Sequence, residues 1–264
     1  MEDLIKTLRK FDEIRTAKKD SQEWDVNEVA KCFMPCAEEI LCKGYFLLNK
    51  KYIIDIGAIE LYYHEEEGEI KDYIMYHTNE HPSKARIFRL KSKYPYFDFG
   101  SFNLHQSGVD VTFEKPNEYR ASFLIRSYRL LEAQDGEYPT DDDTKYDLCS
   151  THLFDDMFYK GIIFGTSENA TKIEWKKTDK KGKIMDEPTI RTNVSMYHIK
   201  DDKLEKLTIE DYMRKHMCLQ EEKGLAIETQ EVDESETEVT TFKSGKKTYV
   251  QDPRKWQFRL KDIK

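Results

Sequence analysis

Three ionisable side chains interrupt stretches of sequence that otherwise have the apolar pattern of buried β-strands. Glu60 lies in GAIELYYHEEEG, Asp110 lies in FNLHQSGVDVTFE, and Arg126 lies in YRASFLIRSYRLLE. A charge in such a strand is costly unless it is paired or faces a polar site. A carboxylate there could take a proton from water, and an arginine could hold an acidic group in place. If the three strands are neighbours, these residues predict a single polar pocket.

Each of the three also has an ordinary structural interpretation. Glu60 could be an edge-strand acid in a salt bridge, and spacing alone favours that interpretation. Asp110 could follow an Asx-type turn at Ser-Gly-Val-Asp. Arg126 could be a structural ion-pair partner of Glu60 or Asp110, which would still be compatible with a site. The residue pattern therefore leaves both interpretations open.

Aromatic and imidazole side chains near these acids are the candidates for binding a ligand: Tyr62, Tyr63, His64, His77 and His105. Alternation along a strand places Tyr62 on the same face as Glu60 and Tyr63 on the opposite face, so one tyrosine is expected to pack in the core. His64 and His77 could equally be exposed loop residues, and His105 could cap a turn.

The first part of the chain, residues 1–44, predicts two helices. Apolar residues recur at helical spacing over residues 3–19, and a second helix is expected to start near Asp25 and end at Gly44. Because Pro35 falls inside the second pattern, a kink or a break into two short helices is expected there.

From residue 45 the apolar period changes from helical to alternating, and residues 45–132 predict the sheet that carries the candidate residues. The expected strands are a hairpin with its turn at 49–51 and a long second strand over 52–64, then 97–105, 109–114 and 120–131. Residues 65–95 predict an extended loop with a short helix.

The remainder, residues 133–264, predicts helices, an excursion and a closing strand. The helices are expected at 145–160 and 208–221, and WQFRL is the closing strand. Residues 228–248 are either a long hairpin or a mobile excursion. The whole chain therefore predicts an α/β (α+β) fold, with a single domain over 1–264 and a curved, mainly antiparallel sheet flanked by helices.

Composition restricts the partners. The 264 residues carry a formal net charge of −8, which argues against binding phosphates unless the basic segments 84–93 and 172–183 form one positive face. The five cysteines have no disulfide or metal-ligand spacing, so we expect no metal and no cofactor. No apolar run is long enough to span a bilayer, and residues 1–15 have no apolar signal-peptide core, which predicts a cytoplasmic protein with no membrane partner. We also expect a monomer.

The order of these pieces resembles the alkyladenine (3-methyladenine) DNA glycosylase family. The matching pieces are AEEILCKGYFL, GAIELYYHE, Asp72 and His77 in DYIMYH, FNLHQSGVDVTF and ASFLIRSYRLLE, followed by IRTNVS and PRKWQFRL. The resemblance lies in this shared order, chiefly over residues 36–132. It implies an alkyladenine-glycosylase-like fold and double-stranded DNA with a flipped base as the partner.

The resemblance also implies roles for individual residues. Glu60 takes the place of the catalytic glutamate, Tyr62 and His77 those of pocket residues, and Arg126 that of the arginine that positions active-site groups. Asp110 falls where the family has an asparagine, so a different base is expected. The implied reaction is hydrolysis of the N-glycosidic bond by activated water, in repair or against foreign modified DNA.

Two other functions remain open from the sequence. The same scaffold could bind modified DNA without cutting it, with Glu60 as a structural residue. Alternatively, the chain could hydrolyse nucleosides or similar N-glycosides, which the acidic balance favours more than it favours either DNA function.

Overall fold

The computed structural model describes residues 1–72, 75, 95–105, 108–139, 143–162, 170–178, 182–191 and 254–263, together with the backbone of the strands between 195 and 251. The chain forms two compact units. Unit 1 comprises Met1–Tyr63, Tyr96–Thr189 and Trp256–Lys264, and unit 2 comprises His64–Pro95 and Ile190–Lys255. The prediction of a single domain did not separate these two units.

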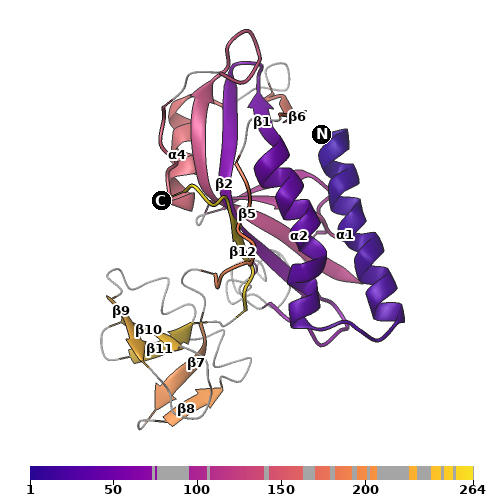
Figure 1. Cartoon of the computed structure of the whole chain (residues 1–264), viewed down its shortest axis with the longest axis vertical. Coiled ribbons are helices and arrows are strands. Elements are labelled where there is room, and N and C mark those ends of the chain that lie inside the picture. Colours follow the sequence, from indigo (N-terminus) through magenta and orange to yellow (C-terminus); the bar gives the residue numbers. More distant parts are fainter. Residues whose placement is uncertain are drawn as a thin grey trace. The chain divides into compact units, whose positions relative to one another are not determined.

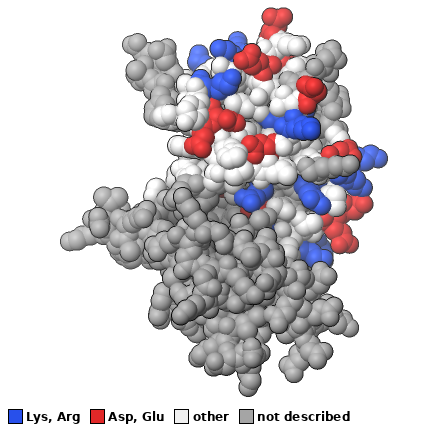
Figure 2. Space-filling model, turned by 90° about the vertical axis from the view of Figure 1, so that its left-hand side faces the viewer, with Lys and Arg blue, Asp and Glu red and all other residues white. Residues whose placement is uncertain are grey.

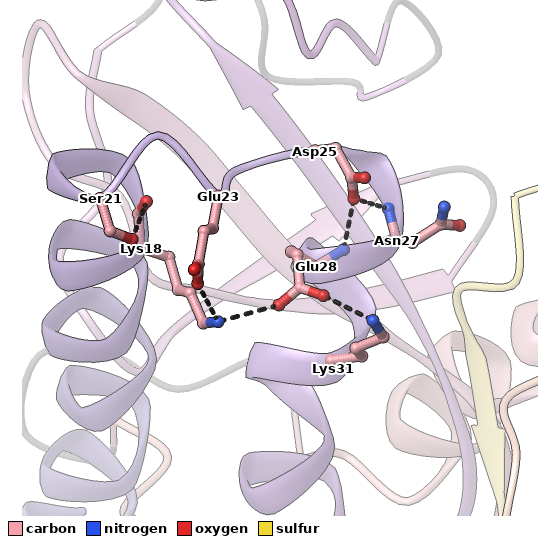
Figure 3. A network of polar contacts seen from close by, with 7 residues as sticks. All are labelled: Lys18, Ser21, Glu23, Asp25, Asn27, Glu28 and Lys31. Carbon is pink, nitrogen blue, oxygen red and sulfur yellow. Dashed lines mark hydrogen bonds and ion pairs between the residues drawn. The ribbon is translucent and has the colours of Figure 1, made fainter.

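Two helices open unit 1: α1 (Glu2–Asp20) and α2 (Val26–Lys43). Asp25 caps α2, because its Oδ1 accepts hydrogen bonds from the backbone N–H groups of Asn27 and Glu28, each at 2.8 Å. Lys18 at the end of α1 lies 2.7 Å from Glu23 and 3.6 Å from Glu28, so a polar network joins the ends of the two helices (Figure 3).

The helix α2 continues through Pro35 as one element, so the predicted break into two short helices does not occur. Proline removes one backbone hydrogen bond from a helix interior. The apolar face of α2 compensates for this loss, because Phe33, Cys36 and Ala37 on either side of the proline are buried.

The seven-stranded sheet of unit 1 has the order β3-β4-β5-β2-β1-β6, with β12 also paired to β2. Its strands are β1 (Gly44–Leu48), β2 (Tyr52–Glu65), β3 (Ser101–His105), β4 (Gly108–Thr112), β5 (Tyr119–Glu132), β6 (Ile173–Lys177) and β12 (Gln257–Arg259). The pairs β1–β2, β1–β6, β3–β4, β4–β5 and β2–β12 are antiparallel. This mixed α/β architecture with a curved antiparallel sheet agrees with the expected α+β class (Figure 1).

One face of the sheet is aromatic and packs against α1 and α2. The ring of Phe11 in α1 lies 5.5 Å from that of Phe113, and Phe33 in α2 stacks on Phe113 at 5.6 Å. Because side chains alternate along a strand, Val109 and Val111 share the face of Phe113, while Asp110 lies on the opposite face.

The opposite face carries α4 (Ser150–Tyr159), and Figure 1 shows α4 and the pair α1 and α2 on different sides of the sheet. The Tyr128 hydroxyl of β5 donates to Asp156 in α4 at 2.6 Å. Gly108 has a φ of +137°, and a Cβ there would lie 2.8 Å from the Ser150 carbonyl oxygen. A glycine is thus required where β4 meets the start of α4.

Unit 2 contains a separate five-stranded sheet with the order β8-β7-β11-β10-β9. Its strands are β7 (Ser195–Lys200), β8 (Lys203–Lys206), β9 (Ala226–Gln230), β10 (Val239–Ser244) and β11 (Lys247–Gln251). A long hairpin or a mobile excursion was expected over 228–248, and the described residues of that range belong to the antiparallel strands β9, β10 and β11. The helix predicted over 208–221 lies outside the described residues, as does most of the segment 65–95.

A buried ion-pair group also belongs to unit 2. Asp72 is fully buried, and Arg191 donates to it at 2.6 Å while Arg254 lies 3.6 Å away. Among the helices that the structure describes, none has the length and hydropathy needed to cross a membrane.

Candidate functional site

Glu60 on β2 is the centre of a polar group in unit 1. Its side chain is 1% exposed. Its Oε2 accepts a hydrogen bond from the Tyr62 hydroxyl at 3.0 Å, and its Oε1 accepts one from Gln257 Nε2 at 3.0 Å. Arg126 Nε lies 3.6 Å from Oε1. A buried carboxylate is therefore held by two neutral donors and one cation, which is the environment that a buried charge requires.

Arg126 connects this carboxylate to the start of α4. Its Nη1 donates to Ser150 Oγ at 2.9 Å, and its side chain is 24% exposed. Arg126 thus contacts residues on β2 and α4 from its own position on β5. The fork of donors on a guanidinium suits a residue that holds two groups in fixed positions.

His105 and Asp110 form a second polar pair on neighbouring strands. His105 Nε2 lies 3.0 Å from Asp110 Oδ2, and the side chains are 11% and 5% exposed. In the β4–β5 register Asp110 is opposite Leu124, so strand alternation places Arg126 on the same face as Asp110. The polar face therefore carries Glu60, Arg126 and Asp110 on strands that follow one another in the sheet.

The other predicted site residues lie elsewhere or outside the described part. Tyr63 is on the face of the sheet that packs against α1 and α2. Arg15 Nε donates to its hydroxyl at 2.6 Å, and its ring lies 5.4 Å from that of Tyr119. His64 belongs to unit 2, where its Nδ1 accepts the backbone N–H of Asp72 at 3.1 Å. His77 lies outside the described residues.

Gln257 and Thr189 are functional candidates that the sequence did not indicate. Gln257 is opposite Glu60 in the β12–β2 register. Thr189 Oγ1 donates to Gln257 Oε1 at 3.0 Å, while Gln257 Nε2 donates to Glu60. A polar residue between Trp256 and Phe258 in a buried strand was the available signal.

A second buried carboxylate on β2, Asp55, was also missed, although YIIDIG carries the same local signal as the sequence around Glu60. Its Oδ2 accepts from Arg129 Nε at 3.0 Å and Nη2 at 2.6 Å, from the Tyr138 hydroxyl at 2.8 Å and from the Tyr146 hydroxyl at 2.7 Å. Burial and then the Asp55 charge raise the pKa of both tyrosines. Burial lowers the pKa of Arg129, but its contacts with Asp55 outweigh this and raise it.

The described residues contain no group of three or more His, Cys, Asp or Glu side chains that could hold a metal ion. The basic segment 84–93 lies outside them. On the face drawn in Figure 2, Lys and Arg side chains are interspersed with Asp and Glu in the described part.

Comparisons with models of protein families, with curated proteins and with solved structures found no match. A buried glutamate, an adjacent arginine and a histidine–aspartate pair can activate water, hold a developing positive charge and offer both hydrogen-bond donors and acceptors.

Proposed function

We propose that the chain is a DNA glycosylase in which Glu60 activates the water that cleaves the N-glycosidic bond. The observation that carries this proposal is the surroundings of Glu60. Its carboxylate is buried, each of its oxygens accepts a side-chain hydrogen bond, and Arg126 lies 3.6 Å away. The order of sequence pieces that resembles the alkyladenine glycosylases adds support, because it assigns the catalytic position to the same glutamate.

In the proposed reaction Glu60 takes a proton from water as that water attacks the sugar carbon. The negative charge of Glu60 also stabilises the oxocarbenium-like sugar that forms while the bond to the base breaks, as carboxylates do in glycoside hydrolysis. The electron pair of the broken bond leaves with the base, which takes up the proton that Glu60 removed from water, so the products are the free base and an abasic site. Arg126 keeps the carboxylate in place through its contacts with Glu60 and Ser150.

The histidine–aspartate pair is proposed to hold the base. A flipped base leaves the stack at a cost of a few kcal/mol, and a damaged or modified base lowers that cost. Asp110 supplies acceptors and His105 can supply a donor, so the pair suits a base edge that carries complementary groups. Because Asp110 stands where the family that the sequence resembles has an amide, a base other than an ordinary alkylated purine is expected.

The test is release of base from duplex DNA. Purified protein is incubated with duplexes that carry different modified bases, and abasic sites are then cleaved by alkali. We expect cleavage of at least one modified duplex, and Glu60→Gln should lower the rate by about 100-fold or more, because the base that activates water is lost. Glu132→Gln, which changes an exposed glutamate at the end of β5, is the matched control and should retain the wild-type rate.

A second candidate function, hydrolysis of free nucleosides or similar N-glycosides, is favoured by the net charge of −8 and by the mixed charges in Figure 2. Release of base from nucleosides but not from any duplex would replace the first proposal with this one. Salt-sensitive retention on DNA without base release would instead indicate a binding module.

A further inference from the structure

The hydrogen bonds around Glu60 continue into a second layer. Gln257 donates to Glu60 Oε1 at 3.0 Å through its amide nitrogen, while its amide oxygen accepts from Thr189 Oγ1 at 3.0 Å. A side-chain amide can turn over and exchange its donor and acceptor ends. Because the ionised Glu60 carboxylate can only accept, the amide nitrogen of Gln257 faces it, and the Thr189 hydroxyl then donates to the amide oxygen.

The backbone holds Gln257 in the same place. Thr189 and Gln257 exchange two backbone hydrogen bonds, at 2.8 Å and 2.9 Å. Gln257 is also opposite Glu60 in the β12–β2 register. Paired residues on antiparallel strands project to the same side, so Gln257 is fixed beside Glu60 both by its backbone and by its amide.

Thr189 and Gln257 lie at the two points where the chain leaves unit 1 and returns to it. Thr189 is the last residue of unit 1 before the segment Ile190–Lys255 of unit 2, and unit 1 resumes at Trp256. Thr189 and Gln257 thus hydrogen-bond to each other where the chain leaves unit 1 and where it returns. Tyr62, the other donor to Glu60, lies one residue before the end of the first segment of unit 1.

We infer that Gln257, held in place by Thr189, is a positioning residue for Glu60, an inference that rests on the proposed glycosylase function. Gln257 fixes Oε1, and the carboxylate then presents its remaining lone pairs to water in one orientation. Catalysis depends steeply on such placement, because small displacements of a reacting group lower the rate without weakening ground-state binding. Gln257 itself touches neither the sugar nor the base in this scheme.

The experiment measures single-turnover base release by the full chain on the duplex that wild type cleaves, with rates and half-saturation determined separately. Gln257→Leu should lower the maximal rate about tenfold and leave half-saturation within about twofold. Thr189→Val, which keeps the shape of threonine, should lower the rate by about threefold. Thr189→Ser, which keeps the hydroxyl, should restore the wild-type rate.

A double variant separates positioning from general damage to the fold. In the Glu60→Gln background, adding Gln257→Leu should cause no further loss, because the group it positions has already been replaced. A wild-type rate in Gln257→Leu, equal rates in Thr189→Val and Thr189→Ser, or a full additional loss in the double variant would each overturn the inference alone. Absence of base release by wild type would instead remove the proposed function together with this inference.

Discussion

Asp55 and Glu60 are two buried carboxylates on the same strand, and their surroundings differ in kind. Asp55 is fully buried, and a single oxygen accepts hydrogen bonds from Arg129, Tyr138 and Tyr146 at 2.6–3.0 Å. Glu60 has its contacts divided between both oxygens, and its cation lies 3.6 Å away.

The difference indicates how buried acids can be sorted. The hydrogen bonds of Asp55 connect β2 to Arg129 on β5 and to the segment after β5, so this group holds neighbouring parts of unit 1 together. Arg126, the cation beside Glu60, is 24% exposed. The same face of the sheet also carries the His105–Asp110 pair. We infer that a carboxylate enclosed by several short contacts to one oxygen serves stability, whereas a carboxylate whose contacts are divided between both oxygens is the better candidate for chemistry.

The largest effect on stability is expected at Asp55. Asp55→Asn leaves Arg129, whose side chain is 17% exposed, without its counter-charge. Removing one partner of a buried ion pair costs about 3–5 kcal/mol, and the partial exposure of Arg129 places the expected loss near the lower end. Urea unfolding measures it. Glu60→Gln should cost less, about 1–2 kcal/mol, because the cation of Glu60 lies 3.6 Å away whereas that of Asp55 lies at 2.6 Å. Equal losses in the two variants would remove the distinction between the two carboxylates.

The sequence predicted the local elements well and their convergence less well. Alternation located β2 and β5 to within a few residues, and it placed Tyr62 and Tyr63 on opposite faces. That Arg126 would reach Glu60 depends on the order β4-β5-β2, which no local pattern determines. Gln257 approaches Glu60 from the far end of the chain, so only the folded sheet reveals it. Asp55 had the same local signal as Glu60, and only its partners distinguish the two.

Effects of intermediate size are expected from one tyrosine that hydrogen-bonds to Asp55 and one that hydrogen-bonds to Glu60. Tyr146→Phe removes a hydrogen bond to the Asp55 carboxylate and should lower the free energy of unfolding by about 1.5 kcal/mol, with base release unchanged. Tyr62→Phe removes the donor to Glu60 Oε2, so base release should fall about tenfold. Both variants are compared by urea unfolding and by base release. The comparison fails if Tyr146→Phe lowers base release more than Tyr62→Phe does.

The smallest effect is expected at a partly exposed carboxylate, Asp147, which provides a counterpart near the surface to the two buried ones. His152 Nδ1 lies 2.8 Å from Asp147 Oδ2, and this hydrogen bond raises the pKa of His152 above its ordinary value. The pKa of Asp147 is lowered, because its hydrogen bonds with the Cys149 amide and with His152 outweigh its burial.

These shifts determine how the pair responds to pH. A raised histidine pKa contributes stability that is complete below the unfolded-state value of about 6.5 and is lost as the pH rises through the folded-state value. A lowered aspartate pKa contributes stability above about pH 4 that is lost as the pH falls. The pair should therefore stabilise the start of α4 most between these limits, by a small amount because it is exposed.

Proton NMR of the imidazole tests this directly, with His152→Gln used to assign its signal among the seven histidines. The pKa of His152 should lie above its ordinary value in wild type and should fall in Asp147→Asn, which removes the largest cause of the shift. Because α4 begins at Ser150, which Arg126 contacts, the same titration can be followed by base release at each pH. If the start of α4 helps to hold Arg126, Asp147→Asn should lower release slightly from about pH 4 up to the raised pKa of His152, and the two proteins should converge as the pH rises through that pKa. A difference that persisted unchanged to high pH would show that the ion pair is not its cause.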